Sequence, residues 1–241
     1  VNDYYSTQIN YKGTPVRVQS LDYGDIFKWL KNTKEGIPAY IIVDMTTQKA
    51  ETTTNITGDK AIVTTTESNI KDAISKAEKE NTNSIVISSA DTKDATNITL
   101  EIPVSAAQNI AENSNLSLEV ETASGNVSIS NETLNSIVEQ VGTDENLKVT
   151  VEITSADKVL ESVSEESAKT ITENVEKSIL ENAVIVEVNI TSGDKHVRSF
   201  GGNKLTVDVP VDGKGHNEGK HYKVHIVSAD GKMDTTFGTC V

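Results

Sequence analysis

From Ala61 onward, the chain repeats one hydrophobic pattern three times. In the second and third repeats, aliphatic residues fall at every second position, then three or four residues apart, then at every second position again; in the first, short aliphatic runs at 61–63 and 85–87 flank the same helical spacing. The first spacing is typical of a strand with one buried face and the second of an amphipathic helix, so each repeat predicts a strand–helix–strand unit. Ile98 and Val127, at equivalent positions of the second and third repeats, lie 29 residues apart. A unit of about 30 residues is therefore expected to recur along the chain.

In the first unit, Thr64 and Glu67 have the spacing of a capping box at the start of a helix. The second strand of that unit is expected at 84–88. The residues that define the helices and the later strands are, in chain order, Ile70, Ala73, Ile74 and Ala77; Ile98, Leu100, Ile102, the helix 105–111, Leu116, Leu118 and Val120; and Val127, Ile129, Leu134, Ile137, Val138, Val141, Leu147, Val149, Val151 and Ile153.

A further helix is expected to follow Ser164. The Ser164 hydroxyl suits a helix N-cap, and Glu165 and Glu166 complement the positive end of the helix dipole. Three alternating strands then follow, at 184–190, 205–211 and 222–226. Strict alternation indicates sheets with one face in water, which favours antiparallel pairing. The predicted fold class is α+β, with mostly antiparallel sheets, about four short helices packed on one side, and repeated strand–helix–strand units.

Residues 1–50 differ from the rest in composition, because they hold seven of the ten aromatic residues and a charge of +1, against −15 for the remainder. We expect a small aromatic-rich segment there, with strands at 15–18 and 41–43 around a helical turn at 22–31. The polar stretch 46–58 indicates either a linker, placed at 51–58, or a polar strand edge. An acidic α+β module over 59–241 follows and admits a division into 59–154 and 155–241. The alternative is a chance fluctuation within one domain.

The net charge of −14 excludes several classes of protein. An acidic chain repels nucleic-acid phosphates, and no basic patch offsets this, so no nucleic-acid partner is expected. No apolar run approaches the roughly 18 to 20 residues that span a bilayer, so we expect no membrane insertion by this fragment. The single cysteine, Cys240, excludes disulfide scaffolds and cysteine-rich zinc sites.

All four histidines lie within thirty residues of one another: His196, His216, His221 and His225. On one strand, His221 and His225 would stand about 13 Å apart, too far to share an ion. The stretch 212–218 alternates like a calcium loop, but Lys214 and His216 occupy positions where oxygen ligands belong. Gly213, Gly219 and Lys220 do not have the spacing of a phosphate-binding loop. The sequence therefore predicts no catalytic, cofactor-binding or metal-binding residue, and no enzyme.

Three stretches near the C-terminal end carry a resemblance to a known family. ITSGDK at 190–195, FGGNKLTVDVP at 200–210 and HYKV at 221–224, with the strand and helix over 120–134, resemble the α+β module that precedes S-layer homology repeats in surface proteins of Gram-positive Firmicutes. The resemblance covers about 55–241 and implies an exported, non-catalytic stalk or display domain whose last strand continues beyond Val241. The repeats themselves are missing here. GIPAYIIVD at 36–44 resembles a short extracytoplasmic segment of large Firmicutes membrane proteins.

The predicted function is a non-catalytic structural or display module of a bacterial cell-surface or S-layer-associated protein. It is expected to be extracellular, at the cell wall, with its signal peptide outside this fragment. The alternative is an adhesin or ligand-binding domain that recognises a protein partner through an exposed strand edge. A third hypothesis, an enzyme domain, requires a pocket with converging polar groups. The expected partners are envelope or host surface proteins, and the sequence leaves two questions open: the oligomeric state, and whether 1–50 and 51–241 belong to one natural protein.

Overall fold

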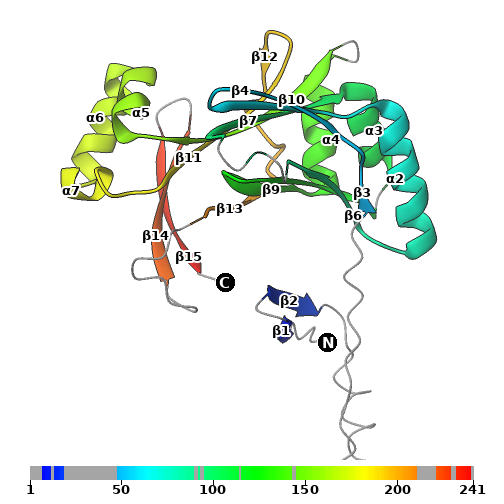
Figure 1. Ribbon diagram of the computed structural model, residues 1–241. Coiled ribbons are helices and arrows are strands. Elements are labelled where there is room, and N and C mark those ends of the chain that lie inside the picture. The colour runs from blue at the N-terminus through cyan, green and yellow to red at the C-terminus, as the bar shows by residue number, and fades with distance from the viewer. Residues whose placement is uncertain are drawn as a thin grey trace, which may run out of the picture. The chain divides into compact units, whose positions relative to one another are not determined.

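The computed structural model describes residues 7–11, 14–18, 48–89, 92, 95–113, 115–142, 145–210, 221–228 and 232–239 (Figure 1). Residues 46–214 and 223–236 form one compact unit, referred to below as the main unit. A hairpin of β1 (Thr7–Tyr11) and β2 (Thr14–Val18) belongs to a second unit. The strand expected at 15–18 is confirmed within β2. The helical turn expected at 22–31 and the strand at 41–43 lie outside the described residues.

Two sheets make up most of the main unit. The six-stranded sheet has, in spatial order, β12 (Lys195–His196), β11 (Ile185–Ser192), β10 (Asn146–Thr154), β7 (Asn97–Pro103), β5 (Lys60–Thr64) and β4 (Thr53–Thr57). The five-stranded sheet has β13 (Leu205–Asp208), β9 (Gly125–Ile129), β8 (Ser117–Thr122), β6 (Ser84–Ser88) and β3 (Gln48–Lys49). A separate ribbon pairs β14 (His221–Val227) with β15 (Met233–Thr239).

Six helices occur in the described residues, in two groups at opposite ends of the sheets (Figure 1). The first group has α2 (Glu67–Glu80), α3 (Val104–Glu112) and α4 (Asn131–Gln140). The second group has α5 (Ala156–Ser162), α6 (Glu165–Asn174) and α7 (Lys177–Leu180). The expectation of about four helices on one side is therefore wrong, because the second group extends the chain between β10 and β11 instead of covering the same end as the first.

Each predicted strand–helix–strand unit crosses from one sheet to the other. The units β5–α2–β6 and β7–α3–β8 stack in parallel, with Ala61 beside Ile98 in one sheet and Ile85 beside Leu118 in the other. The unit β9–α4–β10 crosses in the reverse direction, from the five-stranded sheet to the six-stranded one. The expectation that Ile98 and Val127 occupy equivalent positions is therefore wrong, since Ile98 lies in the six-stranded sheet and Val127 in the five-stranded sheet.

The sheets are mixed, which corrects the prediction of mostly antiparallel sheets while the broader α+β class is confirmed. The pairs β5–β7, β6–β8 and β3–β6 are parallel. Parallel pairing normally brings helices onto both faces of a sheet, and so removes strict alternation. Here the connection between β5 and β7 runs through the other sheet, which covers only the inner face. The outer face of β5 and β7 stays accessible to water, and the alternating pattern survives in these two parallel strands. Strand β6, which is parallel to both of its neighbours, is instead buried on both faces and does not alternate.

One hydrophobic core joins the two sheets and the first group of helices. Ile98, Leu100 and Ile102 on β7 are buried with Leu118 on β8, and Ile70 of α2 closes the core from the helical end. Full burial of one such side chain contributes about 1.5–3 kcal/mol, so this core supplies the main driving force for folding.

Serine and threonine hydroxyls begin most of the helices. Ser164 accepts a hydrogen bond from the backbone N–H of Ser167, which confirms the expected cap of α6. The capping box expected from Thr64 is wrong, because α2 starts two residues later. The Thr66 hydroxyl accepts the N–H of Asn69 at 3.2 Å, while the Thr64 side chain donates to the carbonyl of Thr53 across the β4–β5 hairpin.

Candidate functional site

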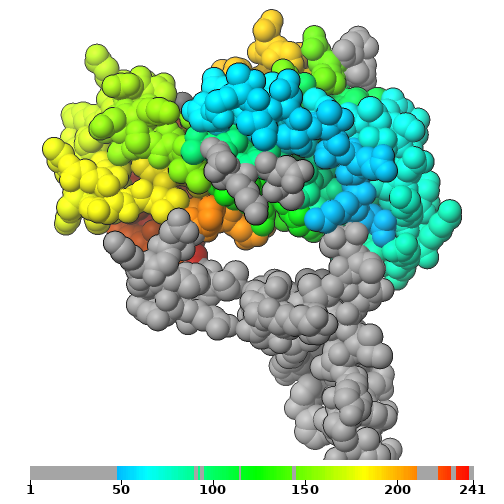
Figure 2. Space-filling model, in the orientation of Figure 1, coloured from blue at the N-terminus to red at the C-terminus, as the bar shows by residue number. Residues whose placement is uncertain are grey.

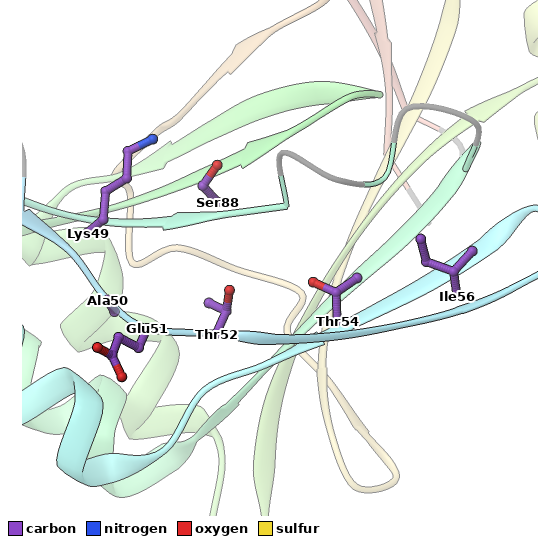
Figure 3. Close-up of a pocket in the computed structure, with 7 residues that line it drawn as sticks. All are labelled: Lys49, Ala50, Glu51, Thr52, Thr54, Ile56 and Ser88. Carbon is purple, nitrogen blue, oxygen red and sulfur yellow. The ribbon is translucent and has the colours of Figure 1, made fainter.

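An open groove of about 540 Å³ lies at one edge of the main unit, where the chain passes from β3 to β4. These two strands are the last of the five-stranded and the six-stranded sheet respectively, so the groove lies at the edges of both sheets. The residues that line it are Lys49, Ala50, Glu51, Thr52, Thr54, Ile56 and Ser88 (Figure 3).

The segment that crosses between the sheets is fixed by hydrogen bonds to its backbone. The N–H of Ala50 donates to the carbonyl of Val86 at 3.0 Å. The carbonyl of Glu51 accepts the Thr65 hydroxyl and the Asn69 side-chain amide, both at 2.9 Å. Because Ala50 is also buried, this wall of the groove is rigidly connected to the core.

Every second side chain along β4 and the residue before it faces the groove. Thr52, Thr54 and Ile56 project to the same side of the strand, facing the strand that carries Ser88 (Figure 3). Ile56 is 49% exposed to solvent, although the residue that pairs with it on β5, Ala61, is buried. An inward-facing isoleucine is half-exposed here because no further described strand follows β4 in the sheet.

The charged groups of the groove do not converge on one point. Lys49 forms an ion pair with Glu121 of β8 at 3.2 Å, and the Glu51 side chain points away from Thr52 and Thr54 (Figure 3). Three hydroxyl groups, one isoleucine and one alanine form the rest of the described lining. Such a lining suits backbone and apolar contacts with another polypeptide better than proton transfer, which needs an acid or base within hydrogen-bond reach of the reacting atom.

Three acids, Glu119, Glu121 and Asp208, lie near one another on the outer face of the five-stranded sheet. Burial raises the pKa of Glu119, the Ser84 hydroxyl opposes this by hydrogen bonding, and the charges of Glu121 and Asp208 raise it further. A carboxyl group of this kind holds its proton longer than an exposed one. In the part of the chain that the structure describes, no three His, Cys, Asp or Glu side chains are placed to hold a metal ion.

The four histidines lie in different settings. His196 lies exposed on β12, at the edge of the six-stranded sheet opposite to β4. His225 on β14 shares a hydrogen bond of 3.1 Å with the hydroxyl of Thr235 on β15. It lines a second open cavity, of about 440 Å³, between α6 and the β14–β15 ribbon. The side chain of His221 and all of His216 lie outside the described residues, as do the stretch 212–218, Gly219, Lys220 and Cys240.

The sequence did not indicate the groove, because no catalytic or binding motif marks its residues and Ser88 reaches them only in the fold. One signal was available: Gly58 and Asp59 separate two strand-like segments by two residues, which is typical of a tight hairpin. The stretch 46–58, expected to be a linker or a polar strand edge, contains β3 and the edge strand β4.

The main unit is thus an α+β sandwich of two mixed sheets, in which β3 and β4 are edge strands as far as the structure describes the chain. Comparisons with protein-family models, with curated proteins and with solved structures find no match for the chain. Among the described residues, no helix has both the length and the apolar character needed to cross a membrane.

Proposed function

We propose that the chain is a non-catalytic structural or display module of an exported bacterial cell-surface protein, of the S-layer-associated kind found in Gram-positive Firmicutes. The proposal starts from the resemblance of 190–195, 200–210 and 221–224 to modules of that kind. Its location would be the cell wall surface, and its partners other envelope or host surface proteins.

The observation that carries the proposal is the division between inner and outer faces of the sheets. The inner faces supply the main aliphatic core, while an uncharged row crosses the outer face of the six-stranded sheet. The row runs through Asn55, Ile62, Thr99, Thr150 and Asn189. A hydrogen bond of 2.9 Å joins the hydroxyls of Thr99 and Thr150. Such a row stays hydrated outside a cell, and a neighbouring row carries the ion pair of Lys148 with Glu101, at 2.8 Å.

Net charge supports the same role. A module with a charge of −14 repels copies of itself at long range and stays soluble when crowded on a surface. The described groove also favours a passive module, because its Lys49 is already paired with Glu121 and its hydroxyl groups have no base beside them among its lining residues.

Labelling of intact cells tests this function. Antibodies raised against residues 48–210 should bind intact cells of the bacterium that encodes the chain, and external protease should remove the signal. Cells that carry the antigen but bind antibody only after lysis would contradict the proposal. A cytosolic protein detected in the same cells serves as the control for lysis.

A second candidate function, an adhesin or ligand-binding domain, is favoured by one feature, the open edge at β4. An extended segment of a host or envelope protein would add to such an edge by backbone hydrogen bonds. Capture of one purified partner by the chain, and its loss with Ile56→Lys, would favour the adhesin over the stalk.

A further inference from the structure

Strand β4 lacks the features that usually protect a sheet edge. Its sequence, Thr53-Thr54-Asn55-Ile56-Thr57, contains no charged residue, and it has no proline and no bulge in its register with β5. Natural edge strands are commonly blocked by lysine, proline or a bulge, because an open edge pairs readily with another strand. The blue atoms of this part of the chain lie open on the surface in Figure 2.

The geometry of the β4–β5 hairpin shows which backbone N–H and C=O groups of β4 point away from β5. Thr57 pairs with Lys60 around a two-residue turn, so this pair exchanges hydrogen bonds within the hairpin. Hydrogen-bonded and non-hydrogen-bonded pairs alternate along an antiparallel ladder. The N–H and C=O groups of Thr54 and Ile56 therefore point away from β5, toward the open side.

The groove lies beside these same two residues. Thr54 and Ile56 line it with their side chains, so a strand that pairs with their backbone would place its own inward side chains over the groove. The added strand would cover Ile56 and extend the inner layer of the sandwich. Backbone pairing and side-chain cover thus coincide at one place.

Charge indicates what kind of strand fits. From Lys49 to Lys60 the only charged residues are Lys49, Glu51, Asp59 and Lys60, which sum to zero, whereas the whole chain carries −14. Two acidic copies meet least repulsion where each is locally neutral. From this neutral edge, which pairs with no further strand in the described part of the chain, we infer that two copies of the chain pair through β4, antiparallel, across a two-fold axis at Asn55.

The register of this pair satisfies both copies at once. Pairing about Asn55 sets Thr54 of one copy opposite Ile56 of the other, and these are the residues whose backbone groups point outward. Thr53 then faces Thr57 of the partner copy. Such β-branched cross-strand pairs stabilise a sheet. The six-stranded sheets of the two copies become one continuous sheet, an isologous contact of the kind that closes a dimer. The inference is independent of the proposed function.

The test compares two isoleucines on adjacent strands. Ile56 and Ile62 are exposed to similar extents, 49% and 43%, but Ile56 faces the groove at the edge while Ile62 lies on the outer face. Sedimentation of the whole chain across a range of concentrations should show a reversible dimer for the wild type and for Ile62→Lys. Ile56→Lys should sediment as a monomer. Circular dichroism of each variant confirms that it is folded.

Two further variants and a control keep the test valid if Ile56→Lys does not fold. Thr54→Pro removes an outward N–H without breaking the β4–β5 ladder, so it should also lose the dimer. In a Cys240→Ser background, Asn55→Cys should form a disulfide-linked dimer under mild oxidation, because residues opposite each other in a non-hydrogen-bonded pair have Cβ atoms about 4.5–5.5 Å apart. Ile62→Cys should not.

Salt provides an independent readout, since screening weakens the repulsion between two chains of charge −14. The dimer should strengthen between low and high ionic strength. A wild-type chain that stays monomeric at every concentration and salt level would overturn the inference. So would a dimer that survives both Ile56→Lys and Thr54→Pro.

Discussion

A Cβ atom on Gly125 would stand 2.8 Å from the backbone carbonyl oxygen of Asp208, closer than real Cβ contacts allow. Gly125 begins β9 with φ of +141°, and the following residue, Asn126, pairs with Asp208 at the end of β13. The absence of a side chain at this position lets the edge strand β13 close against β9.

Gly125→Ala should therefore destabilise the main unit by more than a backbone penalty alone, by at least about 2 kcal/mol. Urea unfolding followed by circular dichroism measures the loss. Gly202 is the matched control, because its φ is +85° and a Cβ there would meet no atom within 4 Å. Gly202→Ala should cost about 1–2 kcal/mol. Equal losses for the two variants would contradict the close approach to Asp208.

Thr66→Ala should weaken the start of α2, because the Thr66 hydroxyl is the acceptor for the N–H of Asn69. The expected loss is about 1 kcal/mol in the free energy of unfolding. Thr64→Ala is the control, since Thr64 lies two residues before the cap and makes only an exposed contact with the carbonyl of Thr53. A larger loss for Thr64→Ala would show that the helix begins at the earlier residue. Thermal unfolding monitored by circular dichroism compares the two.

The raised pKa of Glu119 predicts how the stability of the fold changes with pH. Its pKa in the folded protein is raised from the ordinary value of 4.5, chiefly by burial. The folded state therefore holds this proton more tightly than the unfolded state. The stabilisation from this group is complete below pH 4.5 and is lost as pH rises through the folded-state pKa.

Glu119→Gln removes this charge and keeps a side chain able to bond Ser84. Its free energy of unfolding should exceed that of the wild type at neutral pH, and the difference should shrink as pH falls toward 4.5. Urea titrations of both proteins over that range measure it. A variant that is less stable than the wild type at neutral pH would show that the Glu119 charge stabilises the fold.

Substitution by alanine should lower the free energy of unfolding much more at an inward position than at an outward position of a neighbouring strand. Ile98 on β7 is 1% exposed and belongs to the core, while Ile62 on β5 is 43% exposed on the outer face. Ile98→Ala should lose about 2–5 kcal/mol, and Ile62→Ala less than about 1 kcal/mol. Similar losses in urea unfolding would contradict the assignment of the two faces.

The sequence was sufficient to locate most elements of the main unit, because the hydrophobic period reports directly which face of an element is buried. The strand expected at 84–88 coincides with β6, and the helix expected at 105–111 lies within α3. The same pattern does not indicate which strands pair with one another. A strand with one wet face looks alike whether its neighbour is parallel or antiparallel, so the pairing of β5 with β7 was not foreseen.

The groove and the acidic group around Glu119 depend on residues brought together only by folding. Ser88 and Ile56 belong to different sheets, and Asp208 reaches the neighbourhood of Glu119 through β13. The sequence left open whether 46–58 is a linker or a polar strand edge, because threonine and asparagine suit both, and the structure places the edge strand β4 there. The hairpin turn at Gly58 and Asp59 was the only local signal that distinguished the two.

The central claim is that both sheets are built on one shared core, which uses the aliphatic rows for packing. Hydrogen exchange measured by mass spectrometry tests it most directly. Peptides from β7 in the six-stranded sheet and β8 in the five-stranded sheet should exchange with the same opening free energy, equal to that of global unfolding. Loss of protection in one sheet at a clearly lower free energy than in the other would contradict the shared core.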